Sequence, residues 1–269
     1  MQILRTRDEL AGWRAQQGRV ALVPTMGALH AGHLALVGAA RGMAGAIVAS
    51  IFVNPTQFST AEATATYPRT EPDDIRQLRD AGCDAVWLPD VAAIYPPGDA
   101  TVIEPSGPAL EWEGAARPGH FRGMTTVVTK LFGLVRPDVA MFGEKDWQQL
   151  QVVRRLVTDL VLPVRIAAVP TVREPDGLAM SSRNRFLTVE ERGRAPLLHA
   201  SLRRIAMSDD RDRAVAQERA GLMAAGFSVD YLAVVNADTL RPAPGSACGR
   251  LICAARLGLV RLLDNLAVG

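Results

Sequence analysis

The segment PTMGALHAGHLALV, residues 24–37, places two of the chain's four histidines three positions apart. His30 and His33 flank Ala31 and Gly32, where a short apolar run ends and a stretch of helical composition begins. A helix N-terminus offers unpaired N–H groups and the positive end of the helix dipole, and both attract phosphate. Imidazole N–H groups can donate to the same phosphate oxygens. The pattern therefore indicates phosphate binding, although a single histidine would more often belong to an ordinary core or surface.

Two later runs add groups that suit a charged ligand. GEKD (143–146) contains Lys145, and the chain has only one other lysine, Lys130, since its remaining basic residues are arginines. An ammonium on a flexible stem is a compact charge suited to phosphates, but such a run is equally consistent with a solvated loop. MSSR (180–183) offers two hydroxyls and a guanidinium. Lys130 lies in an apolar run, and the sequence assigns it no role.

A third group of polar residues is acidic. In EPDDIRQLRDAG (71–82), Asp73, Asp74 and Gln77 stand at positions i, i+1 and i+4 of a predicted helix. Acidic residues in a first helical turn usually stabilise the positive end of the helix dipole. They could instead help to hold Mg²⁺, which bridges phosphates and prefers carboxylate and water oxygens. The sequence leaves both interpretations open.

Alternating apolar and amphipathic stretches predict the elements that position these side chains. We expect buried strands at 19–24, 46–54, 83–89, 139–143 and 164–170, and helices at 6–18, 33–44, 71–82, 124–135 and 147–160. Continuous apolar strands that alternate with helices indicate an α/β fold, a Rossmann-like doubly wound parallel sheet. Ligands bind outside the carboxyl ends of such strands. The expected binding loops are therefore 24–33, 54–58, 143–149 and 171–185.

The pattern changes in the last third of the chain. We expect helices at 187–206 and 211–226, followed by strands within 228–237 and 250–265. Thr188 and Glu191 have the spacing of a capping box, as Thr6 and Glu9 have at the start of the first helix. These elements predict a smaller α+β domain, with residues 1–171 forming the first domain and 172–269 the second.

Composition limits the class of protein. The net charge of +2 gives no reason to expect a nucleic-acid surface. No apolar run reaches the roughly 18 residues of a membrane helix, and the charged start MQILRTRDEL lacks the apolar stretch of a signal peptide. We expect a cytoplasmic protein without membrane contact. Cys83, Cys248 and Cys253 are odd in number and lack metal spacing, so buried reduced thiols are expected.

The motifs resemble those of a known family. HAGH resembles the HxGH form of the HIGH motif of nucleotidyltransferases, which attack the α-phosphate of a nucleoside triphosphate and release pyrophosphate. MSSRNRFL (180–187) resembles the second motif of that superfamily, KMSKS, with serines and an arginine but no lysine. Together with SIFVNPTQF, YPRT, RPGHFRGMTTVVTKLF, FGEKDWQQL and RLLDN in this order, they resemble the pantoate–β-alanine ligase family. The resemblance runs from about residue 19 to the C-terminus and is weaker over 200–245.

The resemblance implies a reaction in two steps. The carboxylate of (R)-pantoate attacks the α-phosphorus of ATP, giving pantoyl adenylate and pyrophosphate, and the amine of β-alanine then displaces AMP to give pantothenate, a coenzyme A precursor. It also implies a homodimer formed through the first domain. Mg²⁺ is expected as a cofactor on chemical grounds, with Asp73, Asp74 and Gln77 as candidate ligands from their residue types alone. The second domain would act as a lid, and either of the segments 54–72 and 180–186 could close over ATP.

The resemblance also assigns residues. Those implied in catalysis are His30, His33, Lys145, Ser181, Ser182 and Arg183, with His33 as proton donor. Those implied in ATP binding are Met26, Gly27, Ala28, Leu29, His30, Ala31, Gly32, His33, Gly143, Glu144, Lys145, Asp146, Val172, Met180, Ser181, Ser182 and Arg183. Gln57 would bind pantoate and β-alanine, and Gln149 pantoate. Amides suit the hydroxyls of pantoate because they donate and accept without neutralising its carboxylate.

Three other functions stay open at this point. A nucleotidyltransferase could move AMP or CMP to a different small acceptor, but the glutamines and RPGHFRG disfavour this. A nucleotide-binding regulatory module without catalysis is disfavoured by the intact histidines, Lys145 and SSR. A fragment of an aminoacyl-tRNA synthetase would need an anticodon-binding domain and a basic RNA face, and neither is visible.

Overall fold

The computed structural model describes residues 1–58, 67–246 and 248–269. These residues form two compact units, one of Met1–Glu144 with Val152–Pro170 and one of Lys145–Gln151 with Thr171–Gly269. The short segment Lys145–Gln151 joins the second unit because its own residues bond there: the Trp147 indole N–H donates to Ala237 O at 2.8 Å. Part of the segment 54–72, expected as a possible lid, lies outside the described residues.

The first unit contains a six-stranded sheet in the order β1-β4-β3-β2-β5-β6, with every neighbouring pair parallel. The strands are β1 Gln2–Leu4, β2 Val20–Thr25, β3 Ala46–Ile51, β4 Ala85–Trp87, β5 Val139–Gly143 and β6 Arg165–Val169. The predicted Rossmann-like sheet is confirmed, and β1 is an additional strand that the sequence analysis missed. Strands β3 and β4 follow β2 on one side of it, whereas the next strand, β5, lies on its other side. The strand order therefore reverses between β2 and β5, and this is the topological switch point where ligands bind in such sheets.

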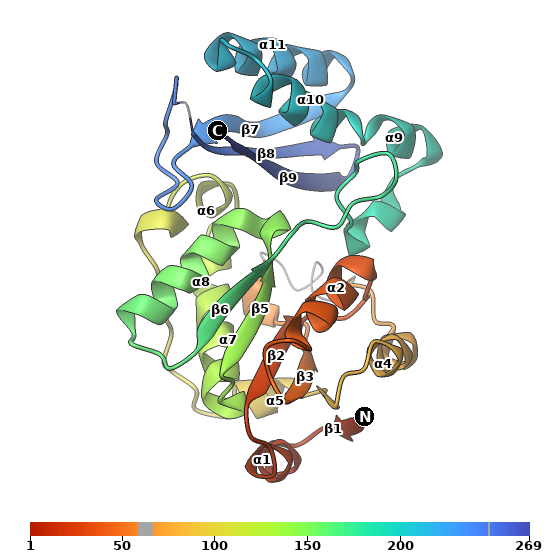
Figure 1. Ribbon diagram of the computed structural model, residues 1–269, viewed down its shortest axis with the longest axis vertical. Helices are drawn as coiled ribbons and strands as arrows, with labels where there is room; N and C mark the ends of the chain where they lie inside the picture. Colours follow the sequence, from red (N-terminus) through yellow and green to blue (C-terminus); the bar gives the residue numbers. More distant parts are fainter. Residues whose placement is uncertain (59–66, 247) are drawn as a thin grey trace. The chain divides into compact units, whose positions relative to one another are not determined.

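Helices cover both faces of this sheet (Figure 1). Ala21 and Val23 of β2 join the apolar cluster formed with α2, whereas Leu22 points to the opposite face and is also fully buried. The helices of the unit are α1 Arg7–Ala15, α2 Ala31–Ala40, α4 Glu71–Asp80, α5 Val91–Ile94, α6 Glu113–Ala116 and α7 His120–Val135, with short 3₁₀ turns η1 Pro55–Gln57 and η2 Gly107–Ala109. The turn η3 Glu144–Asp146 and helix α8 Trp147–Asp159 follow β5.

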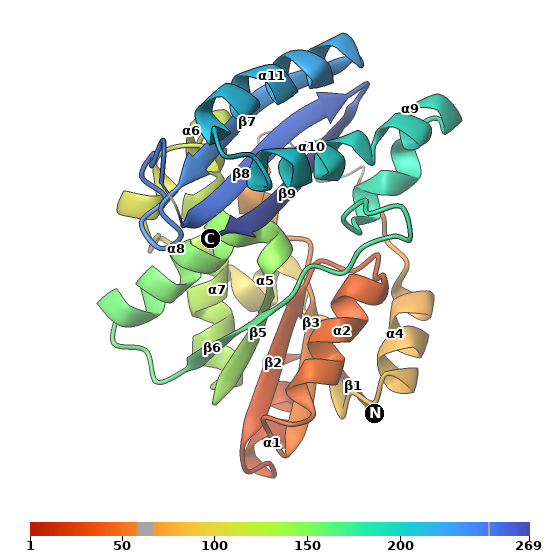
Figure 2. The same ribbon diagram turned by 45° about the horizontal axis from the view of Figure 1, so that its top comes forward.

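The second unit is a three-stranded antiparallel sheet, β7 Phe227–Val235, β8 Gly249–Leu257 and β9 Val260–Val268. Helices α10 Leu197–Ala206 and α11 Arg211–Ala224 pack side by side on one face of it (Figure 2). The predicted α+β architecture is confirmed. The single helix predicted at 187–206 is wrong, because the turn η4 Ser182–Phe186 and helix α9 Val189–Arg194 precede α10 and Pro196 separates the two helices. Proline lacks the N–H that a continuous helix needs at this position.

Several local predictions can be compared directly with the structure. The capping boxes of Thr6 with Glu9 and of Thr188 with Glu191 are both confirmed. Cys83 and Cys253 are buried and free, and burial raises the pKa of the Cys83 thiol to about 12. Cys248 is free but exposed, contrary to expectation, because it precedes β8 in a surface turn. Within the described ranges, no helix is both long and apolar enough to span a membrane.

Candidate active site

The turn between β2 and α2 is held by a carboxylate from another helix. Gly27 and Ala28 have φ angles of 81° and 51°, so the backbone turns sharply after β2. Asp74 of α4 accepts the N–H groups of Ala28 at 3.0 Å and Leu29 at 2.8 Å, and its side chain is buried. A Cβ on Gly27 would meet Asp74 Oδ2 and Ile51 Cγ2 at 3.0 Å each. Glycine therefore suits this position both for its φ and for the close approach of Asp74.

The two histidines cap helix α2 with their Nδ1 atoms. His30 is the N-cap residue, and its Nδ1 accepts from Gly32 N at 3.1 Å. His33 Nδ1 accepts in turn from His30 N at 3.3 Å, and the two rings lie 4.1 Å apart between centroids. Since a ring nitrogen that accepts a backbone N–H carries no proton, each neutral imidazole bears its proton on Nε2. The turn thus presents two Nε2–H donors together with the positive end of the α2 dipole.

The amide of Gln57 is oriented by Asn54, which is 1% exposed. Asn54 Nδ2 donates to Gln57 Oε1 at 2.9 Å, while its Oδ1 accepts from Thr56 N at 3.3 Å and from the Tyr95 hydroxyl at 2.8 Å. The backbone N–H of Thr56 can only donate, so the Asn54 amide has one consistent orientation. With its oxygen bonded to Asn54, the Gln57 amide offers a ligand chiefly its N–H donors.

Residues of the RPGHFRG run brace the same turn. His120 Nδ1 donates to Gln57 O at 3.2 Å, and Arg117 Nη1 lies 3.1 Å from His120 Nε2. The two contacts are consistent with a proton on Nδ1 of His120, the opposite tautomer to that of the α2 histidines. In the sequence analysis, RPGHFRG supported the family resemblance and disfavoured a different acceptor, but neither residue was assigned a place. Nothing in the local sequence around Arg117 and His120 indicates that they contact the turn at Gln57.

Lys130, for which the sequence indicated no role, has a structural one. Its ammonium pairs with Asp99 and donates to Ile94 O at 3.2 Å. It also lies 4.7 Å from the ring centroid of Tyr95. Burial raises the pKa of the Tyr95 phenol, so the hydroxyl stays protonated as it donates to Asn54. Lys130 therefore supports Tyr95, which in turn supports the Asn54–Gln57 pair.

The residues Asp73, Asp74 and Gln77 do not fit a magnesium site. Both carboxylate oxygens of Asp74 accept backbone N–H groups, and Oδ2 also accepts the Thr70 hydroxyl at 3.1 Å. Asp73 is exposed and pairs with Arg76 at 2.9 Å. In the part of the chain that the structure describes, no three His, Cys, Asp or Glu side chains gather as a metal-binding group. Asp74 stabilises the β2–α2 turn, a role that neither interpretation from the sequence gave it.

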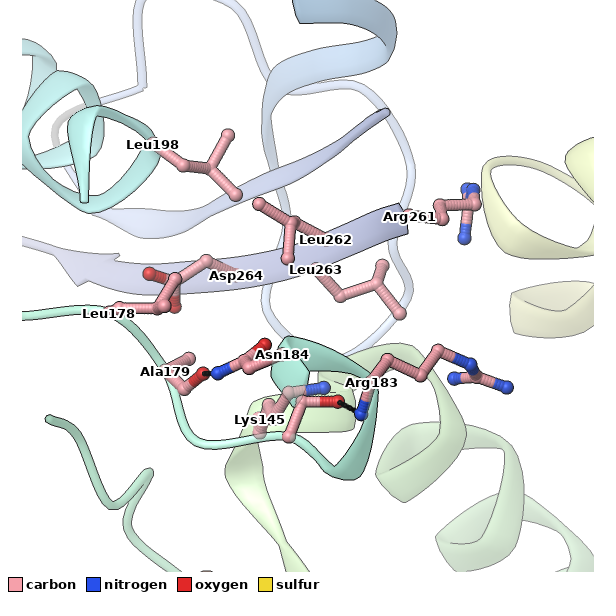
Figure 3. A pocket seen from close by; sticks show the side chains of 11 residues that line it. Lys145, Leu178, Ala179, Arg183, Asn184, Leu198, Arg261, Leu262, Leu263 and Asp264 are labelled. Atoms are coloured by element: carbon pink, nitrogen blue, oxygen red, sulfur yellow. Dashed lines mark hydrogen bonds between the residues drawn. The ribbon is translucent and has the colours of Figure 1, made fainter. Parts of the chain in front are cut away.

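The second unit contains a small pocket lined by leucine side chains together with cationic, hydroxyl, amide and carboxylate groups (Figure 3). Lys145, Ser181 and Arg183 line it, together with Asn184 and Asp264. Ser181 Oγ accepts the N–H of Arg183 at 3.3 Å, and Lys145 Nζ lies 3.6 Å from Asp146 Oδ1. The pocket thus combines an ammonium, a guanidinium and a hydroxyl, groups that suit phosphate oxygens. Ser182 begins the turn η4 and is not among the residues that line this pocket.

The remaining predicted residues fall on the expected elements. Gly143 ends β5, Glu144 starts η3, and Gln149 is half-buried in the first turns of α8. Val172 O accepts the N–H of Met180 at 3.0 Å, which closes the loop that leads to Ser181. The structure therefore brings Met26–His33 together in the first unit and Lys145, Ser181 and Arg183 together in the second.

Comparisons with known proteins agree over the whole chain. A family model described as pantoate-beta-alanine ligase matches residues 2–267. Pantothenate synthetase from Acidiphilium cryptum (strain JF-5) is 55% identical over 278 residues, which cover 100% of this chain and 100% of that protein. The crystal structure of pantothenate synthetase from Thermus thermophilus has a TM-score of 0.93 at 46% identity, with 99% of each chain covered. That of pantoate-beta-alanine ligase from Francisella tularensis, complexed with beta-gamma ATP and β-alanine, has a TM-score of 0.85 at 34% identity and covers 99% of this chain and 97% of that chain.

Proposed function

The chain belongs to the pantoate–β-alanine ligase family, and from this premise we propose that it forms a pantoyl adenylate at the turn between β2 and α2. This turn, residues Met26–His33, is called the HAGH turn below. It is an AMP-forming ligase that condenses pantoate with β-alanine and converts ATP to AMP and pyrophosphate. In the first step, a carboxylate oxygen of pantoate bonds to the α-phosphorus while the bond to the β-phosphate oxygen breaks. In the second, the amine of β-alanine attacks the acyl carbon, loses a proton and displaces AMP.

The first step needs neutralisation of negative charge, because an anionic nucleophile approaches a polyanion. His30 and His33 supply two Nε2–H donors whose orientation is set by backbone N–H groups on Nδ1. Preorganised donors cost no reorientation when charge builds on the α-phosphate. We assign His33 as the donor to the developing charge and His30, with the backbone of Met26–Leu29, to binding of ATP. This pair of fixed donors at the start of α2 is the observation that carries the proposal.

The pantoate and β-alanine sites are assigned to amides. Gln57 is proposed to donate from Nε2 to pantoate and to contact β-alanine, since its Oε1 is already bonded to Asn54. Gln149 is proposed to bind a pantoate hydroxyl. Amide donors hold the substrate without a formal charge, so the carboxylate keeps its nucleophilicity.

The second unit is proposed to serve the same ATP. Lys145, Ser181, Ser182 and Arg183 are assigned to its phosphates. Val172 is assigned to the adenine through its backbone. The other residues assigned to ATP binding in this part of the chain are Gly143, Glu144, Asp146 and Met180. ATP is proposed to react as its magnesium complex, with no side chain of this chain assigned to the metal. The second unit is proposed to act as a lid. The chain is proposed to work in the cytoplasm as a homodimer, and light scattering on the purified protein would test the dimer by its mass.

Pyrophosphate exchange tests the order of the two steps. With pantoate present and β-alanine absent, the enzyme is expected to exchange labelled pyrophosphate into ATP, because the adenylate forms before the amine acts. Exchange that requires β-alanine would contradict a free adenylate intermediate. Exchange that proceeds equally without pantoate would instead point to a different acceptor for AMP.

A further inference from the structure

The RLLDN run, which contributed to the family resemblance, has no place in the proposed function so far. Its last two residues, Asp264 and Asn265, lie on β9 and are 4% and 3% exposed. Adjacent residues of a strand point to opposite sides. Asp264 lines the pocket of Figure 3, and the Asn265 side chain bonds to Lys145 in η3 and to Arg250 on the neighbouring strand β8. Buried polar side chains need hydrogen-bond partners. The partners of Asp264 and Asn265 therefore indicate which segments this pair holds.

Asn265 holds the backbone of Lys145. Its Nδ2 donates to Lys145 O at 2.8 Å, across 120 positions of sequence. Its Oδ1 accepts from Arg250 Nε at 2.7 Å. The Arg250 guanidinium carbon lies 3.6 Å from the ring centroid of Trp147, which is two residues after Lys145. Asn265 and Arg250 thus hold the Lys145–Trp147 segment at two points.

Asp264 connects Asn265 to the segment that ends in Ser181–Arg183. Its two oxygens accept from Arg173 Nη2 at 2.8 Å and Nη1 at 2.7 Å, and Oδ1 accepts the N–H of Asn265 at 2.7 Å. Arg173 Nη1 also donates to Gly177 O at 3.0 Å, and Arg173 pairs with Ala179 in a β-bridge. The pair on β9 is therefore bonded both to the Lys145 segment and to the loop before Ser181.

We propose that Asn265 is a positioning residue for the adenylation step, acting through Lys145, with Asp264 holding its backbone in place. The proposal rests on the assignment of Lys145 to the phosphates. A lysine side chain has four rotatable bonds, so its ammonium keeps a defined reach only if its main chain is anchored. Misplacement of a catalytic group by about 1 Å can cost roughly 100-fold in rate. Asn265 holds the main-chain carbonyl of Lys145, whose ammonium is the group proposed to bind the phosphates.

A double-mutant cycle tests this proposal. Asn265→Asp keeps the size and the acceptor for Arg250 but places an oxygen against Lys145 O, and Lys145→Met removes the ammonium. Pantoate-dependent pyrophosphate exchange is measured in the full chain, with kcat and the KM for ATP separated. We expect Asn265→Asp alone to lower kcat by roughly 10- to 100-fold. In the Lys145→Met background, the same change is expected to lower it by less than about twofold, because interacting residues are not additive.

The outcomes distinguish the inference from the proposed function. Equal effects of Asn265→Asp in both backgrounds would overturn the inference and leave Lys145 in its assigned role. An unchanged rate in Lys145→Met would remove Lys145 from the phosphate site and the inference with it. Asp210→Ala serves as control, because it removes the cap hydrogen bond to Arg213 N at the start of α11, in the same unit but outside the turn that bonds to Trp147. If Asn265→Asp fails to fold, Asn265→Ala takes its place in the same cycle.

Discussion

The HAGH turn and the Lys145 pocket are proposed to act on the same ATP, yet they are positioned by contacts of different range. In the turn, His30 bonds to Gly32 and His33 bonds to His30, so the donors are oriented within four residues of sequence. Around the pocket, Asn265 bonds to Lys145 over 120 positions and Asp264 to Arg173 over 91. The first arrangement follows from local helix capping. The second exists only after the three-stranded sheet has formed.

The largest effect is expected from His33→Ala. Removing one donor to the developing charge should lower single-turnover adenylation by roughly 10²–10³-fold, with a smaller loss of ATP affinity because the donor acts mainly in the transition state. The lost cap bond should cost about 1 kcal/mol of unfolding free energy. His30→Ala should behave similarly, with a larger share of its effect on ATP binding.

Thr6→Ala is the matched control for His33→Ala. It removes the side chain of a similar capping box at the start of α1 and should also cost about 1 kcal/mol. Its adenylation rate per folded molecule should equal that of the unmodified chain. A His33→Ala protein that is destabilised to the same extent but fully active would refute the catalytic role of the turn.

Gln57→Ala should mainly affect pantoate. Loss of buried hydrogen bonds is worth about 1–3 kcal/mol, so the KM for pantoate should rise roughly 5- to 150-fold while that for ATP changes far less. Gln149→Ala should act in the same direction. Gln77→Ala on α4 is the control and should leave both constants unchanged. Steady-state kinetics with each substrate varied in turn measures both KM values. An equal rise in the KM for pantoate and for ATP would mean that Gln57 supports the fold of the site and does not bind pantoate.

Asp74→Asn tests a long-range contact of the HAGH turn. The amide offers a single acceptor where the carboxylate serves both Ala28 and Leu29, so the turn should loosen, with a stability loss of about 1–3 kcal/mol. Adenylation should fall by roughly tenfold, less than for His33→Ala, since both histidines stay. Asp73→Asn should change neither quantity. If either variant shifted the dependence of the rate on Mg²⁺ concentration, the metal interpretation of these acids would regain support.

The smallest effect concerns acid stability of the second unit. Burial raises the pKa of Asp264, but the His199 ring, whose Nδ1 lies 3.3 Å from Oδ2, and the hydrogen bonds from Arg173 outweigh it and hold the pKa below its usual value. A carboxyl with a lowered folded pKa contributes stability above its unfolded pKa of about 3.9, and this is lost as the pH falls through the folded value. Unfolding free energy should therefore decrease below about pH 4, and less steeply in Asp264→Asn. An exposed pair such as Arg155–Asp159 supplies the control in Asp159→Asn. Identical slopes in all three proteins would contradict the role of Asp264.

The sequence by itself determined the parallel sheet, the small α+β unit and the site of the histidine pair. These follow from patterns within about 15 residues, such as apolar strands next to helices, or a Thr–Glu pair at cap spacing. Asp74 shows the limit of such patterns: its place in the first turn of α4 was predicted, but its bonds to Ala28 and Leu29 depend on where α4 lies against the sheet. The break at Pro196 was readable from the sequence and was missed. The strand β1 was missed because its three residues make a pattern too short to detect.

Only the tertiary structure decided which polar residues meet. No local rule relates Asn265 to Lys145, His120 to Gln57, or Lys130 to Tyr95, because each contact joins elements whose order in space comes from burial of their apolar faces. Apolar burial is non-directional and tolerates many side-chain choices, whereas each of these buried polar groups requires one partner at hydrogen-bond distance. The residue types proposed to perform the chemistry could therefore be named from the sequence, while the residues that position them became visible only in the folded chain.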